Sequence, residues 1–364
     1  MKVAVSVFSN ILEDNGTTVR ARRVCDALRE HFDVTLIAAK SGKGQRGHDQ
    51  TTYISVPRAR QSLQIPTWVL GLLRVMLRNK FDVVFYLNDW FGFSVLHILS
   101  ATHKHEAIFE AHGILSDEYR FLGRSKMVVA FAQLLEKYVM KHASAVLALS
   151  QGIFNFYMNY NHNIELVPVF VDTERYRPDI QKHQELRQDY CVSGKLIGLI
   201  GPFNIKSNEH FLTFLHENIS RFDSRIKFMV IGKCDHRIEN ERIIYTGYVE
   251  DYIDHLACLD CVLVPSRIAT TGPLNKVLES MSLGLPVFTT PAGLVGLDYV
   301  TPGQDILVFE EKDLVNKIHE SIFDEGFIEE IGKNARHTVE VYYSKEVNTK
   351  KLTKLFGVDS YVGY

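Results

Sequence analysis

A cation, a carboxylate and a proline lie within seven residues of one amphipathic segment. Lys276 and Glu279 stand three residues apart on its polar side, and Pro273 precedes them. An exposed helix N-terminus offers N–H groups and a partial positive charge, and a nearby lysine adds a full charge, so the segment could bind phosphate. A carboxylate one turn further on accepts hydrogen bonds from a pair of sugar hydroxyls. Together these features suggest a nucleotide site, although the two charged residues alone could equally form a solvated pair.

The flanking residues predict a short helix. Thr271 or Gly272 is expected to cap it, and Pro273 to take its first position, where the missing N–H costs nothing. Gly284 is expected to end the helix. Upstream, Arg267 adds a second cation beside the expected phosphate. The apolar positions recur at helical spacing and predict one buried face: Leu274, Val277, Leu278 and Met281.

Length and composition are those of a globular protein with two domains. The chain has 364 residues, of which 46% are hydrophobic and 23% charged, and this length suits two units of Rossmann size. The net charge is −2, with a more basic first half, and we expect no nucleic-acid partner. The apolar run at the N-terminus is too short for a signal peptide, and no run approaches the roughly 18 residues of a membrane span. We therefore expect a cytoplasmic protein.

Two residue types receive structural interpretations. Cys258 and Cys261 form the one C-x-x-C spacing among five cysteines, and they run into an apolar segment, so buried packing is favoured over zinc or redox chemistry. Trp68 and Trp90 both stand beside apolar runs. We interpret them as packing or interface aromatics rather than as platforms for a sugar.

The pattern of elements predicts an α/β protein with two parallel sheets. The run "VAVSVF", a helix at about Thr18 to Glu30 and the run "DVTLIAA" form a βαβ unit, and later apolar runs repeat the pattern. A polar stretch near 178–194 marks a boundary. We predict domains at 1–178 and 179–344, followed by a last helix and tail at 345–364 that could return to the first domain. The first turn lacks G-x-G-x-x-G, which argues against a dinucleotide cofactor.

Several segments resemble a known family. "NIELVPVFVDTERYRP", "GLIGPFNIKSNEHFLTF", "IIYTGYVEDYIDHLACLDCVLVPSR" and "TGPLNKVLESMSLGLPVFTTPAGLVGL" look like the retaining GT-B glycosyltransferases of family 4, the glycogen synthase and sucrose synthase superfamily. The resemblance implies two Rossmann-like domains facing each other across a cleft. The N-terminal domain would then bind the acceptor and the C-terminal domain a nucleotide-diphosphate sugar.

The resemblance also implies roles for individual residues. Glu279 would bind the ribose hydroxyls, Arg267 and Lys276 the diphosphate, and His112 in "EAHG" would lie near the transferred sugar. The residues implied to take part in catalysis are His112, Arg267 and Lys276. Donor contacts are implied for Gly16, Thr17, Gly201, Thr271, Gly272, Pro273, Leu274 and Glu279. Candidate acceptor contacts are Glu110 and Asp117, although Asp117 could equally begin a helix.

Two departures from the family pattern concern the donor. The family often has E-x7-E, but Thr271 stands where the first glutamate would be. Pro202 replaces the arginine of a G-R-x-x-x-x-K pattern, and Arg267 matches a subgroup that supplies its arginine from another loop. We interpret the positive charge as relocated. No D-x-D occurs in the sequence, which is consistent with a reaction that uses no metal and no cofactor besides the donor substrate.

The resemblance implies a retaining transferase that moves a sugar from a nucleotide-diphosphate sugar to a hydroxyl of a glycan or lipid-linked acceptor, in polysaccharide or glycolipid biosynthesis. One alternative is a non-catalytic GT-B module that binds sugar nucleotide, which would tolerate loss of the cationic residues. Another is a nucleotide-sugar epimerase. That reaction needs acid and base carboxylates, and Thr271 argues against it.

Two basic, amphipathic segments of the first half suggest peripheral contact with an anionic membrane. Such helices also simply pack on a parallel sheet, and both interpretations remain open. One segment combines Trp68 and a run of leucines with Arg58, Arg60, Arg74, Arg78 and Lys80. The other contains Arg120, Arg124, Lys126, Lys137 and Lys141.

Overall fold

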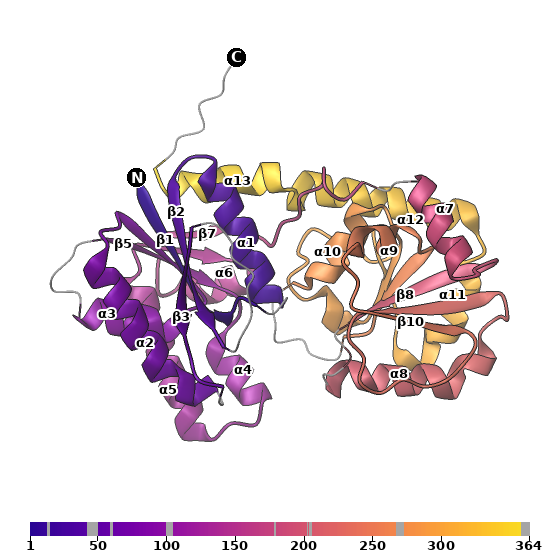
Figure 1. Ribbon diagram of the computed structural model, residues 1–364, viewed down its shortest axis with the longest axis horizontal. Helices are drawn as coiled ribbons and strands as arrows, with labels where there is room; N and C mark the ends of the chain where they lie inside the picture. The colour runs from indigo at the N-terminus through magenta and orange to yellow at the C-terminus, as the bar shows by residue number, and fades with distance from the viewer. Residues whose placement is uncertain are drawn as a thin grey trace, which may run out of the picture. The chain divides into compact units, whose positions relative to one another are not determined.

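The computed structural model describes residues 1–12, 15–41, 50–58, 61–99, 105–177, 180–201, 203, 206–266 and 273–357. It divides into two compact units, each built around its own parallel sheet (Figure 1). The first unit contains Met1–Val169 and the described chain from Asn348 onward. The second contains the described residues between Phe170 and Val347. This is the predicted arrangement of two Rossmann-like domains.

Within the described residues, the sheet of the first unit has seven parallel strands in the order β3-β2-β1-β4-β5-β6-β7. The strand order reverses between β1 and β4, and ligands of such sheets bind outside the carboxyl ends at this point. The strands are β1 (Lys2–Asn10), β2 (Asp33–Lys40), β3 (Thr51–Ser55), β4 (Val83–Leu87), β5 (Glu106–Ala111), β6 (Ala145–Ala148) and β7 (Ile164–Leu166).

Helices cover both faces of this sheet. Tyr86 of β4 packs on Phe93 of α3, whereas its neighbour Phe85 packs on Phe356 of the C-terminal segment. Successive strand residues point to opposite faces, so these two contacts identify the two layers. The helices are α1 (Gly16–Arg29), α2 (Gln61–Arg78), α3 (Trp90–Leu99), α4 (Leu115–Phe121), α5 (Lys126–His142) and α6 (Gln151–Tyr157).

The sheet of the second unit has six parallel strands within the described residues, in the order β10-β9-β8-β11-β12-β13. Its order reverses between β8 and β11. The strands are β8 (Lys195–Ile200), β9 (Ile226–Ile231), β10 (Ile243–Gly247), β11 (Cys261–Val264), β12 (Val287–Thr289) and β13 (Leu307–Val308).

An apolar cluster of the second unit lies on one face of this sheet, under α8 and α11. Cys258 and Cys261 are buried free thiols in this unit, as their apolar surroundings predicted. The helices are α7 (Ile180–Asp189), α8 (Lys206–Asn218), α9 (Tyr252–Ala257), α10 (Asn275–Ser282), α11 (Leu314–Ser321), α12 (Glu325–Thr338) and α13 (Lys345–Lys354), which continues into the first unit.

The boundary between the units differs from the predicted one. It lies at Val169 rather than near residue 178, because the segment that follows is bound to the second unit. The N–H of Val171 donates to the carbonyl of Tyr343 at 2.9 Å, and the N–H of Lys345 donates to the carbonyl of Val171 at 2.8 Å. These contacts join two distant parts of the chain, so composition alone could not reveal them.

Trp68 is fully buried in the first unit, and Trp90 is 5% exposed. Both are therefore packing aromatics, and Trp68 cannot belong to a membrane-facing surface as one of the basic segments suggested. Among the helices that the structure describes, none combines the length and apolarity that crossing a bilayer requires.

Candidate functional site

Lys276 of α10 lies at the point where the second sheet reverses its order. Its Nζ donates to the carbonyl of Ile200, the last residue of β8, at 3.1 Å. Burial lowers the pKa of Lys276 to about 8. No carboxylate among the described residues forms an ion pair with this ammonium, so it is a desolvated cation held by a neutral carbonyl. Such a group gains stability from an arriving anion.

Glu279 lies one turn further along the same helix and is 8% exposed. The hydroxyl of Tyr252 in α9 donates to its Oε2 at 3.2 Å, which fixes one side of the carboxylate. The sequence predicted that Glu279 lies on a polar side of this helix, yet in the structure its side chain is buried and contacts Tyr252 of α9. A carboxylate held in this way keeps a defined geometry for paired hydroxyl donors.

The start of α10 corrects one expectation. Pro273 was predicted at the first helical position, but the helix begins at Asn275 and the extended residue Leu274 precedes it. Pro273 is buried against the turn at Gly296, whose φ is +82°; a Cβ there would stand 2.6 Å from the proline Cδ. The proline therefore anchors the approach to the helix. Gly284, with φ of +73°, follows the helix end as predicted.

Several residues predicted to bind the donor lie outside the part of the chain that the structure describes. Arg267, Thr271 and Gly272 lie outside the described residues, and so does Pro202. Gly201 directly follows β8, and its N–H donates to the carbonyl of Ile231 at 2.8 Å. It therefore stands beside the carbonyl that Lys276 contacts, and its role in donor binding stays a prediction.

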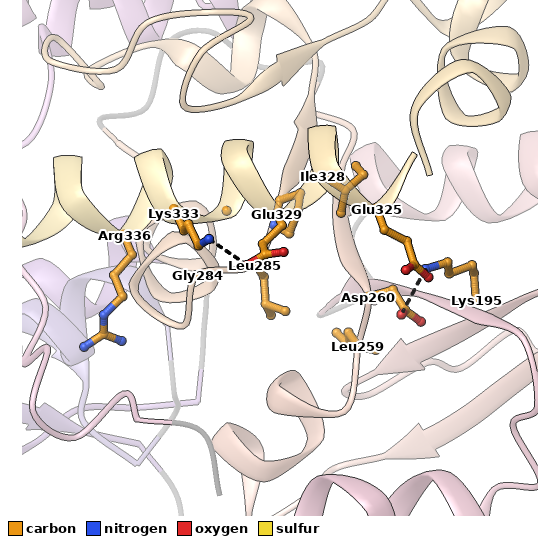
Figure 2. Close-up of a pocket in the computed structure, with 12 residues that line it drawn as sticks. Lys195, Leu259, Asp260, Gly284, Leu285, Glu325, Ile328, Glu329, Lys333 and Arg336 are labelled. Atoms are coloured by element: carbon orange, nitrogen blue, oxygen red, sulfur yellow. Dashed lines mark ion pairs between the residues drawn. The ribbon is translucent and has the colours of Figure 1, made fainter. Parts of the chain in front are cut away.

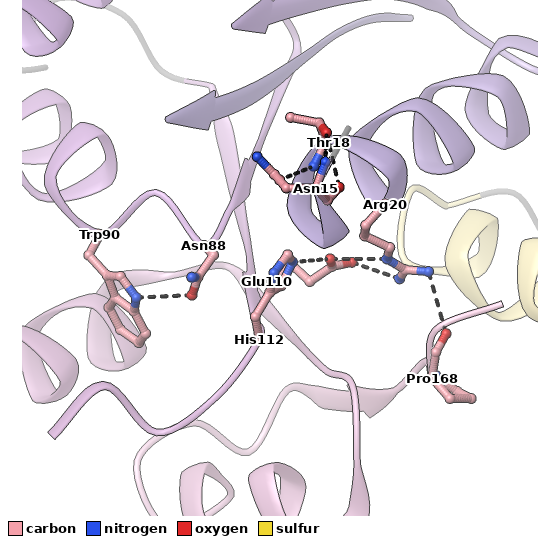
Figure 3. A network of polar contacts seen from close by, with 8 residues as sticks. All are labelled: Asn15, Thr18, Arg20, Asn88, Trp90, Glu110, His112 and Pro168. Atoms are coloured by element: carbon pink, nitrogen blue, oxygen red, sulfur yellow. Dashed lines mark hydrogen bonds and ion pairs between the residues drawn. The ribbon is translucent and has the colours of Figure 1, made fainter. Parts of the chain in front are cut away.

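In the first unit, His112 belongs to a buried charged network at the carboxyl end of β5 (Figure 3). The guanidinium of Arg20 in α1 donates to both oxygens of Glu110, Nε at 3.1 Å and Nη2 at 2.8 Å. His112 Nε2 lies 2.8 Å from Glu110 Oε1. Arg20 also donates to the carbonyl of Pro168 at 3.4 Å.

Electrostatics determine which ring nitrogen of His112 carries hydrogen. Burial alone would raise the pKa of Glu110, but the charge of Arg20 and the contact with His112 outweigh it and lower the pKa to about 2. An ionised carboxylate only accepts hydrogen bonds, so Nε2 of His112 must be the donor. In the neutral imidazole Nδ1 is then an acceptor. His112 is 15% exposed, so it can present this nitrogen to a ligand.

Glu110 does not match its expected role as an acceptor contact. It is fully buried and both its oxygens are engaged, so we reassign it as a residue that positions His112. Asp117 is half exposed and pairs with Arg120 on α4. Asp117 lies in the first turn of α4, as one interpretation allowed, and its contact with an acceptor stays a prediction.

Gly16 and Thr17 are the first residues of α1, behind a side-chain cap (Figure 3). Asn15 Oδ1 accepts from the N–H of Thr18 at 3.1 Å, and Thr18 Oγ1 accepts from the N–H of Asn15 at 3.0 Å. This capping box fixes where the helix begins. The role of Gly16 and Thr17 toward a diphosphate stays a prediction.

Sequence reasoning missed Arg20 and Tyr252. Arg20 contacts Glu110, 90 residues away in the chain, and Tyr252 contacts Glu279, 27 residues away, each from another secondary-structure element. Helical spacing relates residues three or four apart, so it carries no signal for these pairs. The asparagine cap, by contrast, could have been found from an Asn and a Thr three residues apart.

A pocket of about 350 Å³ in the second unit lies away from this site (Figure 2). It is at the amino ends of the strands, beside Lys195 of β8 and Asp260, whereas Lys276 contacts the carboxyl end of β8. Its charges are balanced within the protein: Lys195 lies 3.6 Å from Glu325, and Lys333 lies 2.6 Å from Glu329. It therefore has no unsatisfied charge to recruit an ionic ligand.

The fold is shared with solved glycosyltransferase structures. Sucrose-phosphate synthase from Thermosynechococcus elongatus superposes with a TM-score of 0.79 at 15% identity, covering 98% of each chain. HepE from Anabaena, solved in complex with UDP-glucose, gives 0.77 at 16% identity and covers 98% of this chain and 99% of its own. These likenesses establish the GT-B fold.

Sequence comparisons agree. The capsular polysaccharide biosynthesis glycosyltransferase CapM of Staphylococcus aureus is 24% identical over 246 residues, which cover 61% of this chain and 64% of that protein. One family model, described as Glycosyltransferase Family 4, matches residues 14–175, and another, described as Glycosyl transferases group 1, matches residues 194–324. Each half of the chain therefore matches a glycosyltransferase family model of its own, and the two halves together have the GT-B fold.

Proposed function

We propose that the protein is a retaining glycosyltransferase that moves a sugar from a nucleotide-diphosphate sugar to a hydroxyl of a glycan or lipid-linked acceptor. The observation that carries this proposal is the desolvated ammonium of Lys276 at the carboxyl end of β8, one helical turn from Glu279. A cation for a diphosphate and a carboxylate for ribose hydroxyls are thereby combined on one helix.

The chemistry of the leaving group explains why these residues suit the reaction. Negative charge grows on the nucleotide diphosphate as the glycosidic bond breaks. Lys276 and the first N–H groups of α10 are preformed partners for that charge, and Arg267 is proposed as a third. Because these groups can supply the stabilisation, we propose that the reaction needs neither a metal nor a cofactor beyond the donor.

Retention of the anomeric configuration is proposed to follow from attack on the same face of the sugar. The departing phosphate would assist removal of the acceptor proton. His112, with Nε2–H committed to Glu110, would use Nδ1 to accept a hydrogen bond from the transferred sugar and so orient it. The place of this reaction in polysaccharide or glycolipid biosynthesis is supported by the similarity to CapM.

The donor can be identified by a screen. UDP-, GDP- and ADP-sugars are tested for thermal stabilisation of the protein and for slow hydrolysis by it. We expect one nucleotide class to do both, and the HepE complex with UDP-glucose makes UDP-sugars the first choice. Absence of stabilisation and hydrolysis with every sugar nucleotide would contradict the proposal.

We further propose that the protein acts at the cytoplasmic face of an anionic membrane. Along α5, Met127, Phe131 and Leu134 recur at i, i+4 and i+7 and are 84%, 55% and 68% exposed. The opposite side of the helix is buried, so this stripe is a second apolar face. Exposed lysines flank it: Lys126, Lys137 and Lys141. Apolar side chains bordered by cations suit an interface of anionic lipid.

Co-sedimentation with vesicles tests the membrane contact. Binding should require anionic lipid, fall as salt rises, and weaken when Arg120, Arg124 and Lys126 are changed to Glu. A matched variant changes three exposed cations of the second unit to Glu and should bind normally: Arg221, Lys312 and Lys317. Protein that stays in the supernatant with anionic vesicles at low salt would favour a soluble acceptor.

A further inference from the structure

Asn88 stands where the strand order of the first sheet reverses. It is the first residue after β4, and His112 is the first after the neighbouring strand β5. The N–H of Asn88 donates to the carbonyl of Glu110 at 2.9 Å. Asn88 and His112 therefore lie at adjacent strand ends, on the edge where ligands of such sheets bind (Figure 3).

The backbone of Asn88 is left-handed, with φ of +50°. The next residue holds it there: the carboxylate of Asp89 accepts hydrogen bonds from Ser6 Oγ at 2.7 Å, Trp68 Nε1 at 3.0 Å and the N–H of Gly92 at 2.9 Å. Sparsely populated backbone conformations persist where the surroundings determine them in this way, and they concentrate at functional sites.

The orientation of the Asn88 amide follows from its partner. Trp90 Nε1 donates to Oδ1 of Asn88 at 3.0 Å. An indole nitrogen can only donate, so the contacting atom must be the oxygen and the NH₂ group faces another direction. Asn88 is half-buried, and none of the described residues accepts a hydrogen bond from this NH₂ group. Two oriented donors therefore remain at the strand edge.

In the proposed function, Nδ1 of His112 accepts a hydrogen bond from the transferred sugar while Nε2 is bound to Glu110. The attacking hydroxyl of the acceptor must reach that sugar, and the amide donors of Asn88 stand at the neighbouring strand end. We propose that Asn88 binds the acceptor sugar by donating its amide hydrogens to a hydroxyl of a pyranoside. This inference rests on the proposed transferase function and adds the acceptor contact to it.

Asn88→Asp is the sharpest test. Asp tolerates the left-handed backbone and can still accept from the Trp90 indole, but it has no amide hydrogens to donate. Asn88→Gly keeps the backbone conformation and removes the whole side chain. The matched control is Asn159→Asp, at an exposed position of the same unit.

The probes are the sugar nucleotide that the wild-type protein hydrolyses and three octyl pyranosides, of glucose, galactose and mannose. Hydrolysis uses water as the acceptor, so it reports on the donor site alone. We expect both Asn88 variants to keep wild-type thermal stability within a few degrees and hydrolysis within about twofold. The KM for the octyl pyranoside should rise about tenfold or more in both variants, because each loses the hydrogen bond to the sugar. In the Asp variant, the new carboxylate oxygen also repels the oxygen of the hydroxyl. Asn159→Asp should change neither reaction.

Three results would overturn the inference. The first is an unchanged KM for the pyranoside in Asn88→Asp. The second is a parallel fall in hydrolysis and transfer, which would make Asn88 a structural residue. The third is a wild-type protein that hydrolyses its donor but transfers to none of the pyranosides. A wild-type protein that cleaves no sugar nucleotide would instead refute the proposed function itself.

Discussion

The two candidate sites hold their buried charges in opposite ways. In the first, Arg20 meets both oxygens of Glu110 and leaves no net charge at the strand end. In the second, the ammonium of Lys276 has a carbonyl as its partner, and no carboxylate among the described residues neutralises it. A neutralised pair holds its side chains in a fixed geometry, whereas a desolvated cation is stabilised when an anionic ligand supplies its counter-charge. The first site is therefore arranged for positioning, and the second for binding an anion.

The largest effect should follow from breaking the neutral pair. Arg20→Met leaves Glu110 buried without its cation, and we expect unfolding free energy to fall by about 3–5 kcal/mol. Urea denaturation measures this. On the same helix Arg29→Met removes an exposed pair with Asp26 and should cost less than about 1 kcal/mol. Equal losses in the two variants would mean that the buried network does not stabilise the fold.

In the second unit, the corresponding change should affect binding more than stability. Glu279→Ala removes the proposed contacts to ribose hydroxyls, so donor affinity should weaken by about 1.5–3 kcal/mol, the range for hydrogen bonds to a charged group. Calorimetry with the intact sugar nucleotide that the wild-type protein cleaves measures this affinity. Glu329→Ala, at an exposed pair in the same unit, is the matched control. Unchanged affinity in Glu279→Ala would remove this residue from the donor site.

Donor affinity should depend on pH through the titration of Lys276 in the second unit. Burial places the pKa of Lys276 at about 8, below its ordinary value, and a bound diphosphate favours the charged form. Above pH 8 the free protein has lost this proton and must take it up on binding, so affinity should fall by up to about tenfold per pH unit. Titrations from pH 7 to 9.5 test this. The slope should disappear in Lys276→Met; a slope that persists there belongs to another group.

The smallest expected effect concerns the residue that orients Glu279. Tyr252→Phe removes one neutral donor to the carboxylate, so we expect donor affinity to weaken by about 0.5–1.5 kcal/mol. If this variant weakens binding as much as Glu279→Ala, the tyrosine itself must contact the donor.

The sequence predicted what local pattern determines. The parallel sheets, the buried stripe on α10 with its end at Gly284, and the packing roles of the tryptophans follow from periodicity and turn chemistry. The grouping of Lys276 with Glu279 also follows, because residues three positions apart in a helix lie on the same face.

What the sequence could not predict depends on contacts between distant elements. The burial of Glu110 by Arg20 requires α1 to lie against β5, and the shift of the domain boundary to Val169 requires Val171 to pair with the segment at Ser344. The position of Pro273 before α10 depends on the turn at Gly296. Each belongs to tertiary packing, which overrides local preference.

The central claim is that the second unit uses Lys276 to stabilise a departing nucleotide diphosphate. Its most direct test is proton NMR of the anomeric signal during early turnover of the sugar nucleotide found in the screen. We predict that the transferred or released sugar first appears with the donor's configuration, and that Lys276→Met slows cleavage at least about tenfold, the loss of one preformed charge contact. Inverted product, or equal cleavage by wild type and Lys276→Met, would contradict the account.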